Sequence, residues 1–212
     1  MTDPSPDTDA AYRAIGRYVV AFSYLVRNMR EAIEQRLSPT FDDDDALPKI
    51  ALAGTEAMGI TRAFFGMCRR VGKLDEEELR IEKMLRSDVT RIIEQRNDLA
   101  HGDWFLDLTD LDTGKLRDPV IQRIHALRAE GHEEELTFSA QTLDEAADYI
   151  RDYTVFVIDF GRIALGLRGV MSGGKKETVR VRDVWTISGP KKKPTLTRDG
   201  PRADEVPLSR PA

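Results

Sequence analysis

The 212-residue chain has a single cysteine, Cys68, and only three histidines. One thiol cannot form an internal disulfide and cannot supply the several thiolates of a structural zinc site. His125 and His132 have no Cys or His partners at metal-ligand spacing, so we expect them to be exposed or packing residues. These absences predict no metal site and are typical of a protein of the reducing cytoplasm.

Long apolar runs are also missing. No stretch approaches the ~18–20 apolar residues that cross a bilayer, and residues 1–9 are acidic and contain prolines, unlike a signal peptide. The Gly173-Gly174-Lys175 segment lacks the earlier glycine and the following Ser or Thr of a nucleotide-binding P-loop. We therefore expect no membrane association and no bound cofactor.

Charge is unevenly distributed along the chain. Residues 171–212 contain 10 Lys and Arg against 5 Asp and Glu, whereas residues 1–170 contain 22 basic and 32 acidic residues. Such an acidic body is not typical of a general nucleic-acid-binding protein. The Gly/Lys/Pro-rich segment 171–212 predicts a largely disordered tail, which either attracts RNA electrostatically or only aids solubility.

Apolar residues recur at helical spacing in four segments. The predicted helices cover about 9–36, 47–71, 75–101 and 142–168. The third helix follows a line through Ile81, Leu85, Val89 and Ile92. The first helix follows a line through six apolar residues, and four more widen its face: Ile15, Val19, Phe22, Val26, Met29 and Ile33, with Tyr18, Ala21, Leu25 and Ala32. Acidic and hydroxyl residues at 75–78 and 142–145 predict capping boxes at two helix starts.

After Gly102 the pattern changes to the alternation typical of strands, with Trp104, Leu106 and Leu108 on one side. The predicted fold is therefore mainly α, a four-long-helix bundle with a small β-rich excursion at about 103–141. We expect one helical domain over 9–170, followed by the tail.

Position 96 interrupts the apolar line of the third helix. Four residues after Ile92 the line reaches Arg96, whose charge needs compensation if it faces the core or a partner helix. Asn97 and His101 are four residues apart and share one face, with Arg96 on an adjoining face. A further basic segment, Arg27-Asn28-Met29-Arg30, either extends a phosphate-binding surface or is a solvated face.

The segment 96–102 resembles the signature of HEPN domains, in which an arginine, a polar residue, three further residues and a histidine follow one another. Arg96, Asn97 and His101 match its three positions. The resemblance in general plan extends over residues 9–168. Many HEPN domains are metal-independent endoribonucleases of toxin–antitoxin and anti-phage defence systems.

The resemblance implies a homodimer in which Arg96, Asn97 and His101 of both subunits surround one scissile phosphate in a shared cleft. It also implies RNA as substrate, 2′,3′-cyclic phosphate products and an antitoxin or other regulatory protein as partner. The residue types suit this chemistry, because histidine exchanges protons near neutral pH and arginine stabilises the extra charge on phosphorus. Asn97 would orient the imidazole or the phosphate.

One position departs from part of the family. Some members carry a tyrosine two residues after the histidine, which a partner nucleotidyltransferase modifies, and this chain has Asp103 there. A second function also stays open, because Arg96, His101 and Gly102 equally suit the end of a helix. The chain would then be a catalytically inactive dimeric module that binds a nucleotide, RNA or a partner protein.

Overall fold

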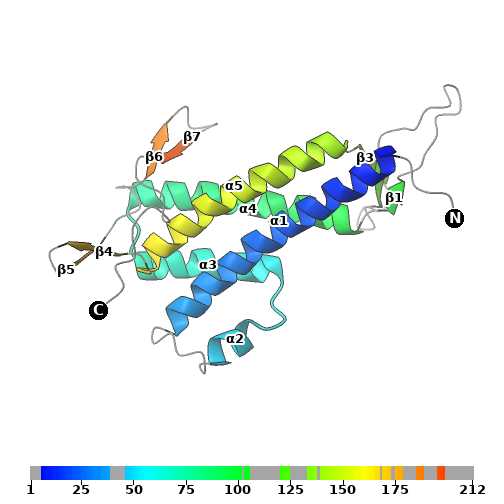
Figure 1. Ribbon diagram of the computed structural model, residues 1–212. Helices are drawn as coiled ribbons and strands as arrows, with labels where there is room; N and C mark the ends of the chain where they lie inside the picture. Colours follow the sequence, from blue (N-terminus) through cyan, green and yellow to red (C-terminus); the bar gives the residue numbers. More distant parts are fainter. Residues whose placement is uncertain are drawn as a thin grey trace, which may run out of the picture. The chain divides into compact units, whose positions relative to one another are not determined.

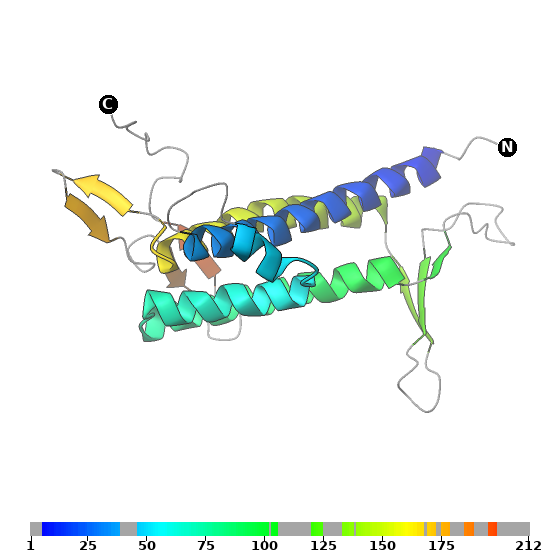
Figure 2. The same cartoon turned by 90° about the horizontal axis from the view of Figure 1, so that it is seen from below.

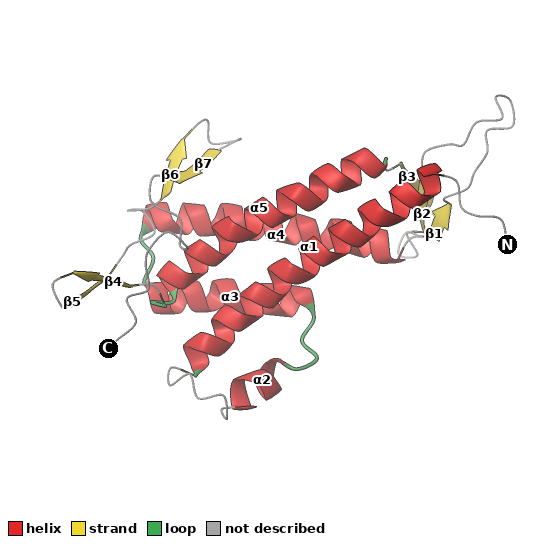
Figure 3. Ribbon diagram, viewed as in Figure 1, coloured by secondary structure: helices red, strands yellow, loops and turns green. Residues whose placement is uncertain are grey.

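The computed structural model describes residues 6–38, 46–101, 103–105, 120–124, 133–137, 139–167, 169–172, 175–178, 185–188 and 195–198. Helices make up most of these residues (Figures 1 and 3), which confirms the prediction of a mainly helical protein. The helices are α1 (Pro6–Leu37), α2 (Ala46–Leu52), α3 (Ala57–Gly72), α4 (Glu76–His101) and α5 (Ala140–Ala164). None of the helices within the described ranges is long and apolar enough to cross a membrane.

Short strands follow α4 and α5. β1 (Asp103–Phe105), β2 (Val120–Ile124) and β3 (Glu133–Thr137) form an antiparallel sheet in the order β1-β2-β3, in which Ile121 pairs with Trp104 and with Leu136. Two antiparallel pairs follow α5. They are β4 (Gly169–Ser172) with β5 (Lys175–Thr178), and β6 (Trp185–Ser188) with β7 (Thr195–Arg198).

The segment 171–212, which the sequence predicts to be a largely disordered tail, includes these short strands among its described residues. Two of the strands coincide with short runs that favour strands, Trp185-Thr186-Ile187 and Thr195-Leu196-Thr197. In β6 and β7 these runs face each other, with Ile187 opposite Leu196.

Contacts divide the chain into two units. The first unit combines Met1–Arg27 with Val89–Thr154, and the second combines Asn28–Asp88 with Val155–Ala212. The helices α1, α4 and α5 each contribute a segment to both. The first unit contains Arg96, Asn97 and His101, and Figure 2 shows its three strands beside the C-terminal end of α4.

The predicted apolar face of α1 is confirmed in most of its residues and wrong in four. The buried residues of this face are Tyr18, Phe22, Leu25, Met29, Ala32 and Ile33. Val19, in contrast, is 41% exposed. Ile15, Ala21 and Val26 are only partly buried. Ala11 and Ala14 extend the buried face toward the start of α1, and the prediction missed them because alanines allow close helix contacts without adding to a count of large apolar residues.

In contrast, the predicted line of α4 is confirmed. Ile81, Leu85, Val89 and Ile92 are each at most 1% exposed. The line is correctly predicted because every one of its members is a large aliphatic residue at strict helical spacing.

The core of the second unit centres on aromatic rings. Phe64 and Phe65 on α3 meet edge to face with ring centroids 5.1 Å apart, and the Phe65 ring lies 6.2 Å from that of Phe160 on α5. A Cβ at Gly161 would lie 2.2 Å from the Phe64 ring. The close approach of Phe64 to α5 therefore requires glycine at position 161.

The single helix predicted over 47–71 is wrong, because α2 and α3 are separate. Gly54 between them adopts a left-handed φ of 71°, which interrupts the helix. The Arg30 guanidinium of α1 donates to the carbonyl oxygens of Leu52 at 2.9 Å and Thr55 at 3.1 Å. These bonds satisfy two backbone acceptors at the break, which the local sequence does not reveal.

Capping residues fix the starts of α4 and α5. Asp75 Oδ1 accepts from the Glu78 amide at 3.0 Å, and Glu78 Oε2 accepts from the Asp75 amide at 3.0 Å, which confirms the capping box at 75–78. The box predicted to begin at Thr142 is wrong. Ser139 is the cap, because its hydroxyl accepts from the Thr142 amide and its own amide donates to the Thr142 hydroxyl, both at 3.1 Å.

Candidate functional site

The three motif residues occupy the last two turns of α4, which ends at His101. Asn97 and His101 are exposed, whereas Arg96 is half-buried and Leu99 between them is 5% exposed. The helix therefore anchors the motif through Leu99 while its polar side chains remain accessible. This arrangement follows directly from helical spacing, because Asn97 and His101 lie one turn apart on the solvent side.

The positive charge of Arg96 is stabilised by the aromatic ring of Phe22. The Cζ of Arg96 lies 5.6 Å from the centroid of the Phe22 ring on α1, within the range of a cation–π interaction. Its Nη1 also donates to Asn97 Oδ1 at 3.4 Å. No carboxylate forms an ion pair with Arg96 among the residues that the structure describes.

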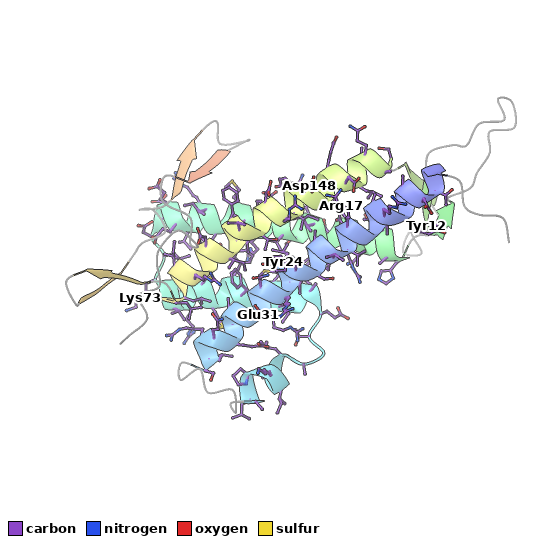
Figure 4. The ribbon with its side chains drawn as sticks, in the orientation of Figure 1. Tyr12, Arg17, Tyr24, Glu31, Lys73 and Asp148 are labelled. Atoms are coloured by element: carbon purple, nitrogen blue, oxygen red, sulfur yellow. The ribbon has the colours of Figure 1, made fainter. Side chains whose placement is uncertain are left out.

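Arg17 on the same helix as Phe22 is different, because two carboxylates occupy its guanidinium. Its Nη1 lies 2.6 Å from Asp144 Oδ1, and its Nη2 lies 2.7 Å from Asp148 Oδ1 (Figure 4). Arg151 also contacts Asp148, at 3.0 Å. This network joins α1 to α5 within the first unit and leaves Arg17 little capacity to bind a further anion.

The structure does not bring Arg96 and His101 together. No hydrogen bond or ion pair joins them within the described part of the chain, and a five-residue separation turns them about 140° apart around the helix. Gly102, which suits the end of a helix, lies outside the described residues. The chain therefore presents the Arg96 guanidinium and the His101 imidazole on different sides of α4.

Tyr18 on α1 is a buried tyrosine that contacts α4 one turn before the motif. Tyr18 is 1% exposed, and its hydroxyl donates to the Ile92 carbonyl oxygen at 3.4 Å. Burial raises the pKa of Tyr18 to about 12, and the Asp98 carboxylate adds to the rise. Tyr18 is therefore protonated at neutral pH and serves packing and hydrogen bonding rather than proton transfer.

The second unit holds a charge cluster that sequence reasoning missed. The Glu82 side chain is fully buried, with Arg69 Nη2 2.5 Å from its Oε2 and Arg86 Nε 3.8 Å from its Oε1. Burial raises the pKa of the Cys68 thiol, and the Glu82 carboxylate raises it further, so the thiol is unreactive. The sequence contains one indication that Glu82 is buried, because Glu82 directly follows Ile81 and lies three residues before Leu85 on the apolar line of α4.

The remaining sequence candidates contribute little to this site. Arg30 is part of neither a phosphate-binding surface nor a solvated face, because its guanidinium binds backbone carbonyl oxygens at the break between α2 and α3. Met29 in the same segment is fully buried. His125 and His132 lie outside the described residues. No group of three or more His, Cys, Asp or Glu in the described ranges could hold a metal ion.

Comparison of the chain with protein-family models, with curated proteins and with solved structures gives no match. The resemblance to HEPN domains therefore rests on the sequence alone, with its specific match confined to residues 96–102.

Proposed function

We propose that this protein is a metal-independent endoribonuclease of the HEPN type, which acts as a homodimer and uses Arg96, Asn97 and His101. One observation carries the proposal. Arg96 is a half-buried cation that has no carboxylate partner among the described residues, although Arg17 and Arg69 in the same protein are both neutralised. A cation held near the surface without a counter-ion suits the binding of a phosphate.

The reaction is an internal transfer at phosphorus. The RNA 2′-oxygen bonds to phosphorus as its proton passes to a base, and the bond from phosphorus to the 5′-oxygen breaks as that oxygen takes up a proton. His101 is suited to exchange these protons because a ring nitrogen of imidazole can both accept and donate a proton. Arg96 would stabilise the charge that develops on the phosphoryl oxygens, and the products carry a 2′,3′-cyclic phosphate and a 5′-hydroxyl.

A homodimer would bring together an arginine and a histidine that lie on different sides of α4 in a single chain. If two copies of α4 line one cleft, the guanidinium of one chain and the imidazole of the other can reach the same phosphate. The apolar residues exposed on α1 support a protein–protein contact, since Tyr12, Val20 and Tyr24 are 56%, 69% and 55% exposed. An antitoxin or other regulatory protein is a further partner in this proposal, with a role in growth arrest or anti-phage defence.

The test is incubation of the purified protein with labelled RNA of mixed sequence in EDTA, beside a His101→Ala variant. We expect cleavage with cyclic-phosphate ends by the wild type and none by the variant. Stability should change by less than about 1 kcal/mol, because His101 is exposed and loses only a helix-terminus interaction. Gln95→Ala, an exposed change on the same helix, is the matched control and should retain activity.

Negative charge near the motif favours the second candidate function, an inactive module that binds a nucleotide, RNA or a partner protein. Asp98 lies within the motif, and residues 1–170 are acidic overall. Under this alternative, RNA would remain intact while fluorescence anisotropy still detects its binding. The absence of both cleavage and binding would leave a protein partner as the remaining form of this alternative.

A further inference from the structure

We infer that Phe22 is a positioning residue for Arg96, whose ring holds the guanidinium ready for a phosphate without neutralising it. This inference rests on the proposed function. It concerns a residue on α1, which lies outside the motif and which helical spacing alone marks only as core.

The position of the Phe22 ring is fixed by its surroundings. Phe22 is 6% exposed and lies on the buried line of α1, one turn after Tyr18 and three residues before Leu25. Both neighbours are at most 1% exposed. A ring packed in this way has few alternative rotamers, so it offers a fixed surface to the cation that lies 5.6 Å from its centroid.

An aromatic ring beside an arginine leaves more of its N–H donors available than a carboxylate does. An aromatic face attracts a cation through its quadrupole, whereas a carboxylate accepts hydrogen bonds from the same N–H groups that would bind a phosphate. The other contact of Arg96, Asn97 Oδ1 at 3.4 Å, is neutral and engages one nitrogen. Phe22 and Asn97 thus restrain the side chain, and no described residue neutralises its charge.

This role predicts a loss of activity that depends on the ring rather than on apolar volume. Phe22→Leu keeps an apolar side chain of similar size but removes the aromatic face, and we expect kcat/KM for RNA to fall about fivefold. Phe22→Tyr keeps the ring and should retain activity. Phe65→Leu is the matched control, since it removes a buried ring of the second unit whose neighbours are Phe64 and Phe160.

A fluorination series separates the electrostatic role from packing. Replacing Phe22 by its mono-, di- and trifluorinated analogues changes the shape little and weakens the negative face of the ring stepwise. We expect log kcat/KM to fall in step with the number of fluorine atoms, while the melting temperature stays nearly constant. An activity that is unchanged across the series, with loss of stability alone in Phe22→Leu, would overturn the inference.

The inference can also be tested without cleavage. In the NMR spectrum of the full chain, the Arg96 side-chain Nε–H resonance should show a ring-current shift and restricted motion, and both should be lost in Phe22→Leu but not in Phe65→Leu. If wild-type protein fails to cleave RNA but the resonance behaves in this way, the proposed function fails and the positioning contact stands. If the resonance is unaffected by Phe22→Leu, the inference fails whatever the activity.

Discussion

The buried ion pair of Arg69 and Glu82 should respond very differently to the loss of either partner. The Glu82 side chain is 0% exposed, whereas that of Arg69 is 42% exposed. Removing Glu82 leaves a cation that can turn into water. Removing Arg69 instead leaves a carboxylate inside the protein, and that is the costly defect.

The magnitudes follow from the remaining contacts. Loss of one partner from a buried pair typically costs about 3–5 kcal/mol. Arg86 still lies 3.8 Å from Glu82, so we expect the lower end, about 3 kcal/mol, for Arg69→Met. Glu82→Met should cost less than about 1 kcal/mol, because it also removes Oε1, which has no hydrogen-bond partner among the described residues.

Urea unfolding of the two single variants and the double variant measures these free energies. We expect Arg69→Met combined with Glu82→Met to be more stable than Arg69→Met alone by about 2 kcal/mol. Arg80→Ala is the control, because its pair with Glu76 is solvent-exposed on both sides and should contribute less than about 0.5 kcal/mol. If Glu82→Met lowers the free energy of unfolding more than Arg69→Met does, burial of the unpaired carboxylate is not the main cost of breaking this ion pair.

Two further predictions concern buried packing. Because the pKa of Tyr18 rises from 10.0 in the unfolded chain to about 12 in the folded protein, this residue's contribution to stability is constant below about pH 10 and is lost as the pH rises toward about 12. That loss is about 3 kcal/mol, so Tyr18→Phe should flatten the alkaline unfolding curve, and an unchanged curve would contradict the shift. Gly161→Ala should destabilise by about 1–3 kcal/mol, since its Cβ would meet the Phe64 ring. Gly16→Ala, which meets open space on α1, should instead stabilise by up to about 1 kcal/mol, and equal effects of the two in thermal unfolding would refute the packing argument.

Helical spacing and caps made much of the helical framework predictable. The α4 line and the 75–78 capping box are local features, so the sequence alone contains the information needed. The break at Gly54 was missed because glycine tolerates both a helix and a left-handed turn. Arg30 on α1 donates hydrogen bonds to two carbonyl oxygens at this turn, and the local sequence does not reveal that contact.

The candidate site was predictable in its residues but not in its environment. The spacing of Arg96, Asn97 and His101 places two of them on one exposed face, as the structure has them. The spacing also flags Arg96 as a charge on the apolar line. It cannot identify Phe22 as the compensating group, because that contact joins α1 to α4 across a long separation in the chain.

Two charges on α4, Glu82 and Arg96, differ in a way that bears on function. They lie on the same side of the helix, because fourteen residues make nearly four turns. Glu82 is buried and has two arginines for partners, as a structural charge requires. Among the described residues, Arg96 has a ring and an amide for partners and no carboxylate.

A purely structural role would not select a cation at this position. An apolar residue would pack against Phe22 without the cost of partly burying a guanidinium. A basic residue that only complemented the end of α4 would serve equally well at an exposed position in the same turns, such as Gln95 or Ala100. The placement of Arg96 therefore agrees with the proposed role of its charge in binding a phosphate.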